Sequence, residues 1–132
     1  MYRFEKKDNP LVSLGVGKKA LIEKWLNDMC IKNYVLNNDL TIDVDGSVDI
    51  QFRNLTEKFP DYIQFNIING NFHCQYNKLT SLEGFPKTIK GNFYCGKNAI
   101  QFTEKYIKKK CKVSGTIYPY TYDGYEYLSN LK

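Results

Sequence analysis

Apolar residues recur at fixed distances from four glycines, which are separated by 24, 21 and 24 residues. Counted from each of the first three glycines, positions two, four and nine are apolar, and the first two have the period of a β-strand facing one side; the fourth copy is truncated. A unit this short cannot bury its apolar side alone, so the repeat predicts stacked coils with parallel strands, a solenoid. The glycines are Gly46, Gly70, Gly91 and Gly115, and the apolar sets are Val48, Ile50 and Leu55; Phe72, Cys74 and Leu79; and Phe93, Cys95 and Ile100.

Two asparagines mark the bends of the repeats. Asn77 and Asn98 each stand seven residues after a repeat glycine, where the chain must turn. A carboxamide at a bend can hydrogen-bond backbone groups that no strand partner satisfies. We therefore expect both side chains to join neighbouring coils.

The sequence before the first glycine predicts a cap for the open end of the solenoid. Between residues 18 and 30, the apolar residues Leu21, Ile22, Trp25, Leu26 and Met29 fall on one helical face. Residues 33–44 predict a hairpin, with strands at 34–36 and 40–42 around a turn at 37–39. Solenoids need such caps because a bare terminal coil exposes its apolar core.

The C-terminal part predicts a helix before the last strand. Thr103 suits a helix N-cap, Glu104 suits the first turn, and lysines fill the last turn of a helix at 103–111. Residues 113–118 predict the last strand. The chain is thus expected to form one α+β domain, with a cap at 1–45, a repeat region at 46–118 and a Tyr-rich tail at 119–132.

The repeat resembles a known family. The spacing Phe72-x-Cys74-x-x-Asn77-x-Leu79, repeated from Phe93 to Ile100, is similar to the leucine-rich repeat. The string from Asn77 to Pro86, NKLTSLEGFP, and the helix sequence IEKWL at 22–26 resemble small leucine-rich-repeat-like proteins encoded by bacteriophages. The resemblance implies a short leucine-rich-repeat-like solenoid in the host cytoplasm that binds a host protein on its outward strand face. One form of that function is inhibition of a host factor, including anti-defence activity.

Composition narrows the classes of function. The net charge of +5 is mild, and the aromatic content of 15% includes eleven tyrosines, which suit contact surfaces. The N-terminal residues lack the apolar stretch of a secretory signal, and no segment is apolar enough to span a membrane. We expect a cytoplasmic protein without membrane contact. Its four cysteines, Cys30, Cys74, Cys95 and Cys111, are expected to be free thiols.

The sequence offers no good catalytic or metal site. His73 and Cys74 are adjacent on a strand, so their side chains point to opposite faces and cannot act together. The cysteines are spaced too widely for a CxxC zinc site, and Cys74 and Cys95 occupy equivalent core positions. Asp43, Asp45 and Asp49 are expected to lie on a solvated strand face. With a single histidine and no cofactor motif, we expect a non-enzymatic protein without cofactor or metal.

Two surfaces remain as candidates for binding. The outward residues between the paired core positions, Asp49, His73, Tyr94 and Tyr118, are expected to form the partner-binding column. The alternative is nucleic-acid binding through a lysine cluster, with the Tyr-rich tail providing stacking surfaces. That cluster consists of Lys105, Lys108, Lys109, Lys110 and Lys112. The open ends of a solenoid also make a homo-oligomer one of the expected partners.

Overall fold

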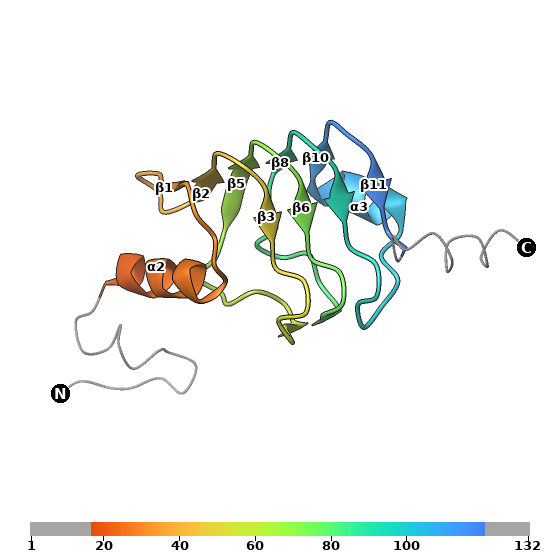
Figure 1. Cartoon of the computed structure of the whole chain (residues 1–132), viewed down its shortest axis with the longest axis horizontal. Coiled ribbons are helices and arrows are strands. Elements are labelled where there is room, and N and C mark those ends of the chain that lie inside the picture. The colour runs from red at the N-terminus through yellow and green to blue at the C-terminus, as the bar shows by residue number, and fades with distance from the viewer. Residues whose placement is uncertain (1–16, 121–132) are drawn as a thin grey trace, which may run out of the picture.

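The computed structural model describes residues 17–120, which form a β-solenoid of about three turns with parallel strands and two helices (Figure 1). Its core is a continuous ladder of side chains from successive coils, in which Phe72 and Phe93 are fully buried with ring centroids 5.9 Å apart. The solenoid expected from the glycine-keyed repeat is confirmed.

Sheets A and B form two sides of the solenoid. Sheet B follows the glycines and contains, in spatial order, β11 (Ile117–Tyr118), β9 (Phe93–Tyr94), β6 (Phe72–His73) and β3 (Val48–Asp49), paired in parallel. Sheet A precedes the glycines and contains β1 (Tyr34–Leu36), β2 (Ile42–Val44), β5 (Phe65–Ile68), β8 (Thr88–Ile89) and β10 (Lys112–Val113). Only the β1–β2 pair of sheet A is antiparallel.

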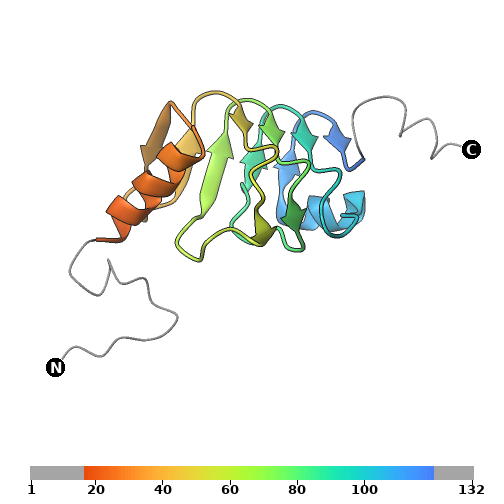
Figure 2. The same ribbon diagram turned by 60° about the horizontal axis from the view of Figure 1, so that its bottom comes forward.

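Sheet C is a short third side. It pairs β4 (Thr56–Glu57) with β7 (Lys78–Leu79) in parallel and comes forward in Figure 2. Leu79, at position nine of its coil, is fully buried there, as expected. The equivalent Ile100 is 46% exposed, so its predicted core position is wrong. The chain bends over residues 97–100, and Phe102 is buried instead.

The expected cap is present. Helix α2 (Lys18–Asp28) buries Leu21, Ile22, Trp25 and Leu26, and the ring of Trp25 lies 5.3 Å from that of Phe59 and 6.2 Å from that of Phe65. The hairpin is confirmed, but its second strand is residues 42–44 rather than 40–42. The shift arises because β2 also pairs with β5, which aligns Ile42 and Val44 with the core.

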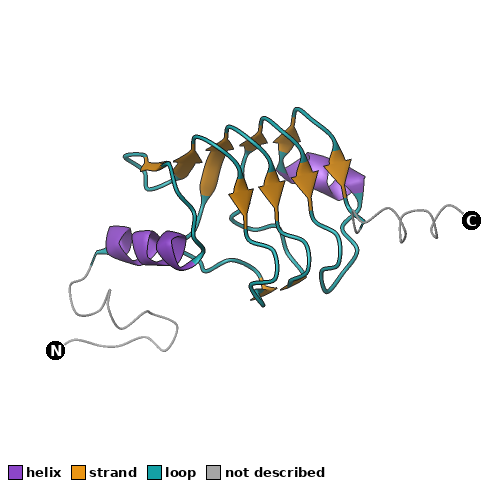
Figure 3. Ribbon diagram, viewed as in Figure 1, coloured by secondary structure: helices purple, strands orange, loops and turns teal. Residues whose placement is uncertain are grey.

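Helix α3 (Glu104–Lys110) lies at the opposite end from α2, as Figure 3 shows. The Thr103 hydroxyl accepts a hydrogen bond from the Tyr106 N–H at 3.1 Å, which confirms the predicted N-cap. The strand predicted at 113–118 is wrong as a single element. It is divided into β10 and β11 because the chain turns at Ser114 and Gly115 from sheet A to sheet B, as it does at each earlier repeat glycine.

Candidate interaction surface

The outward side chains of sheet B form one column, as expected. The register sets Asp49 opposite His73, His73 opposite Tyr94, and Tyr94 opposite Tyr118. The His73 and Tyr94 rings stack with centroids 4.2 Å apart and planes 5° apart, and the Tyr94 and Tyr118 rings stack at 4.8 Å and 8°. Cross-strand contacts of this kind hold the column as a continuous aromatic stack.

A second aromatic stack runs beside the first, and the sequence analysis missed it. Phe52 and Tyr76 each stand six residues after a repeat glycine, and their rings stack at 4.4 Å and 9°. The backbone is left-handed at both residues and at the equivalent Lys97, with φ of 56°, 62° and 54°. Bulky residues adopt this conformation at a cost of about 1 kcal/mol. The recurrence of aromatics at position six was the signal that could have revealed this stack.

Asp49 of the column and Phe52 of the second stack line one shallow open depression, together with Gln51 and Arg53. Its acidic member is held in place, since Asp49 Oδ1 accepts hydrogen bonds from the backbone N–H and the side-chain Nε2 of Gln51 at 3.1 and 3.0 Å. The aromatic face is defined here as Asp49, Phe52, His73, Tyr76, Tyr94 and Tyr118. Within each stack the rings contact one another through their faces.

His73 is electrically neutral in this setting. Burial lowers the pKa of the imidazole, while Asp49 acts in the opposite direction as the smaller effect. Within residues 17–120, the buried His73 Nδ1 has no hydrogen-bond partner. A neutral ring fits the close parallel stacking on Tyr94 without burying a charge.

Asparagine side chains that accept hydrogen bonds from the next coil fix the spacing of the coils that carry the aromatic face. The Asn71 Oδ1 accepts a hydrogen bond from the Asn92 N–H, and the Asn92 Oδ1 accepts one from the Thr116 N–H, both at 2.8 Å. A Cβ added to Gly91 would lie only 2.7 Å from the Gly70 carbonyl oxygen. Close backbone approach therefore requires glycine at Gly70, Gly91 and Gly115, whereas Gly46 has space around it but a positive φ of 147°.

The bend asparagines behave as expected. Asn77 is 6% exposed, and its Oδ1 accepts from the backbone N–H groups of Arg53 and Leu55, both at 3.0 Å. Its Nδ2 donates to the carbonyl oxygens of Ile50 at 2.9 Å and Cys74 at 3.1 Å. Asn98 repeats the pattern one coil later, accepting from Leu79 N–H and donating to the carbonyls of Cys74 and Cys95.

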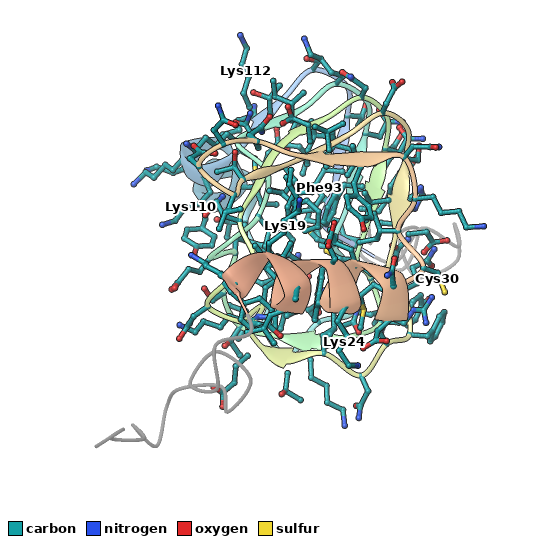
Figure 4. The ribbon with its side chains drawn as sticks, turned by 90° about the vertical axis from the view of Figure 1, so that its left-hand side faces the viewer. Lys19, Lys24, Cys30, Phe93, Lys110 and Lys112 are labelled. Atoms are coloured by element: carbon teal, nitrogen blue, oxygen red, sulfur yellow. The ribbon has the colours of Figure 1, made fainter. Side chains whose placement is uncertain are left out.

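The cysteines are free thiols, and three of them belong to the core. Cys74, Cys95 and Cys111 are buried, whereas Cys30 is exposed at the surface in Figure 4. Burial raises the pKa of Cys74 well above its ordinary value and raises the pKa of Cys95 and of Cys111 to about 12. These three thiols stay protonated and unreactive at neutral pH.

The three aspartates do not form a cation site. Asp43 is half-buried in β2, where its Oδ1 accepts from Asn66 Nδ2 and the Ile67 N–H at 3.0 and 3.1 Å. Asp45 and Asp49 are exposed, and residues 17–120 contain no group of three side chains arranged to hold a metal ion. The prediction that all three lie on a solvated strand face is thus wrong for Asp43, whose hydrogen bonds join β2 to β5.

The predicted lysine cluster is exposed at all five positions, on α3 and β10. The Lys108 Nζ forms an ion pair with Glu104 at 2.9 Å, and the Lys110 Nζ lies 5.9 Å from the centre of the Tyr106 ring. Of the tail tyrosines that the alternative function requires, Tyr120 is exposed, whereas Tyr122, Tyr125 and Tyr127 lie outside the described residues.

No described helix is both long and apolar enough to cross a membrane. Comparison of the chain with protein-family models, with curated proteins and with solved structures gave no match.

Proposed function

We propose that this protein is a non-enzymatic interaction module that binds a partner protein through the aromatic face. The observation that carries the proposal is Phe52, whose side chain is 70% exposed, stacks on Tyr76 and stands in left-handed backbone. Glycine or asparagine would suit that backbone better, and the core does not need the ring. An exposed aromatic ring kept at such a position is best explained by contact with a partner.

The remaining features of the face support protein binding. Covering an exposed Phe side chain contributes roughly 1.5–3 kcal/mol to association. Tyrosines and histidine supply flat apolar surface with polar tips, which is the composition of protein-binding hot spots. Asp49 and Arg53 border the Phe52 depression with opposite charges, as the polar rim of an interface does.

The biological setting of the proposal rests on the resemblance to bacteriophage-encoded leucine-rich-repeat-like proteins. In that setting the partner is a host protein in the host cytoplasm, and the outcome is inhibition of a host factor, with anti-defence activity as one form. The strings NKLTSLEGFP at 77–86 and IEKWL at 22–26 carry this association, which concerns the family and not the site.

Phe52→Asn tests the proposal while sparing the fold. Asparagine tolerates left-handed backbone, so the variant should fold with a stability within about 1 kcal/mol of the parent. In affinity capture from a bacterial host lysate, a protein retained in stoichiometric amount by the parent should be lost by Phe52→Asn. The matched control is Val35→Thr, which changes another exposed apolar residue, 60% exposed, in the hairpin.

Three results would refute the proposal. They are the absence of a stoichiometric protein, its equal retention by Phe52→Asn, and its loss with Val35→Thr. Light scattering on the free protein distinguishes self-association, since a dimer abolished by Phe52→Asn would assign the aromatic face to a second copy of this chain.

A further inference from the structure

The charge of the protein is divided along the solenoid axis. Residues 17–69 carry six basic and eight acidic side chains, a net charge of −2, whereas residues 70–120 carry nine lysines and two glutamates, a net charge of +7. Because the coils succeed one another along the axis in chain order (Figure 1), a division in the sequence becomes a division in space. The end that bears α3 is therefore strongly basic.

Strand pairing adds lysines to the cluster that the sequence predicted. Lys112 lies opposite Thr88 in sheet A, and its backbone N–H donates to the Lys87 carbonyl oxygen at 2.8 Å. Lys87 and Lys90, which flank β8, are thereby placed beside β10, and both are exposed. Figure 4 shows Lys110 and Lys112 pointing outward, away from Phe93 in the core. The basic end is defined here as Lys87, Lys90, Lys105, Lys108, Lys109, Lys110 and Lys112.

Few negative charges oppose this surface. The Glu104–Lys108 pair is the one ion pair of the basic end within residues 17–120. Lys105 and Lys109 occupy the helix side opposite the buried Ile107. Helix-end electrostatics favour lysines in the last turn of α3, but they give no reason for Lys87, Lys90 or Lys105. The basic end therefore carries more positive charge than the stability of α3 explains.

We propose that the basic end binds nucleic acid through its phosphates, without reading base sequence. Seven lysines and no arginine provide point charges that suit phosphates, whereas the planar fork that recognises base edges or clasps carboxylates is missing from this set. Lysine is depleted from protein interfaces, which makes an acidic protein the weaker candidate. None of the residues of the aromatic face belongs to the basic end.

The test measures binding of the full chain to a fluorescein-labelled 20-base-pair DNA duplex by anisotropy at several NaCl concentrations. If about five lysines contact phosphates, log K should fall with log[salt] at a slope of roughly −4 to −5. Lys105→Gln/Lys109→Gln/Lys112→Gln should make the slope shallower by about 2–3 and weaken binding at least tenfold at 100 mM salt. Lys109→Glu alone should also weaken binding and make the slope shallower. It tests the effect of charge independently if the triple variant fails to fold.

Lys18→Gln/Lys19→Gln/Lys32→Gln is the matched control, since it removes three exposed lysines from the opposite end of the molecule. Unchanged binding by this control supports the proposal, whereas an equal loss in both triple variants overturns it. No duplex binding at 50 mM salt also overturns it. Tighter binding to polyglutamate or to phosphatidylserine vesicles reassigns the surface to an acidic protein or a membrane. The proposed function is tested separately, because Phe52→Asn should leave duplex binding unchanged.

Discussion

The carboxamide of Asn77 makes four hydrogen bonds of 2.9–3.1 Å to the backbone of two coils, and Asn77→Ala removes all of them. At about 1 kcal/mol for each bond, and more where a buried group finds no water, the loss is about 3–5 kcal/mol. That is a large part of the 5–15 kcal/mol typical of a domain and corresponds to a fall in Tm of roughly 10–15 °C.

Urea unfolding followed by far-UV circular dichroism and by the fluorescence of Trp25 measures this loss. Trp25 is the single tryptophan and is buried against the first coil, so it reports on cap and solenoid together. Asn98→Ala should cost less, about 2–3 kcal/mol, because Asn98 makes three such bonds and is only half-buried. Asn38→Ala, at an exposed position in the hairpin loop, is the control and should change stability by less than about 0.5 kcal/mol.

The comparison has a clear refuting result. If Asn77→Ala lowers the free energy of unfolding by less than about 1 kcal/mol, water replaces the carboxamide without loss, and the bend asparagines do not hold the coils together. If Asn98→Ala costs more than Asn77→Ala, burial does not set the strength of the ladder.

The glycine column, the thiols and His73 give three further predictions. Gly91→Ala sets a Cβ against the Gly70 carbonyl and should cost about 2–4 kcal/mol in urea titrations, whereas Gly17→Ala, which has room, should cost little. A thiol reagent should modify one cysteine of the native protein quickly, Cys30, and the three buried ones only after unfolding; four equal rates would contradict their place in the core. Because the folded pKa of the only histidine is lowered, stability should fall as pH drops below about 6.5, and His73→Tyr, which keeps a ring there, should flatten that dependence in unfolding measurements between pH 5.5 and 7.5.

The repeat is evident from the sequence, but only part of each coil follows from its pattern. Its pattern was keyed on residues after the glycines, which gave sheet B and the bend asparagines. A second apolar column stands two residues before each glycine, at Val44, Ile68, Ile89 and Val113, and forms the inner side of sheet A. The signal was present in the sequence, but the apolar partner two residues earlier is kept only at Ile42 and Cys111, whereas Asn66 and Lys87 stand there in the two middle coils.

Only part of each candidate surface could be predicted from the sequence. The outward column of sheet B follows from strand period alone, so Asp49, His73, Tyr94 and Tyr118 could be named without a structure. Phe52 and Tyr76 share position six of their coils, but strand period does not extend to a bend, and left-handed backbone redirects their side chains. Lys87 and Lys90 joined the basic end through pairing between β8 and β10, whose residues are 24 apart in the chain.

The sequence by itself determined the coil length, the glycine column, the buried positions of the sheet B strands, the two helices and the charge at each end. These features depend on the local period of apolar residues and on residue type. Both are set within a short stretch of the chain. The tertiary structure decided where each coil bends, which rings stack, which lysines lie together and that Phe102 rather than Ile100 enters the core. The physical reason is that these contacts join residues more than twenty positions apart, and only the register of stacked coils brings such residues within reach.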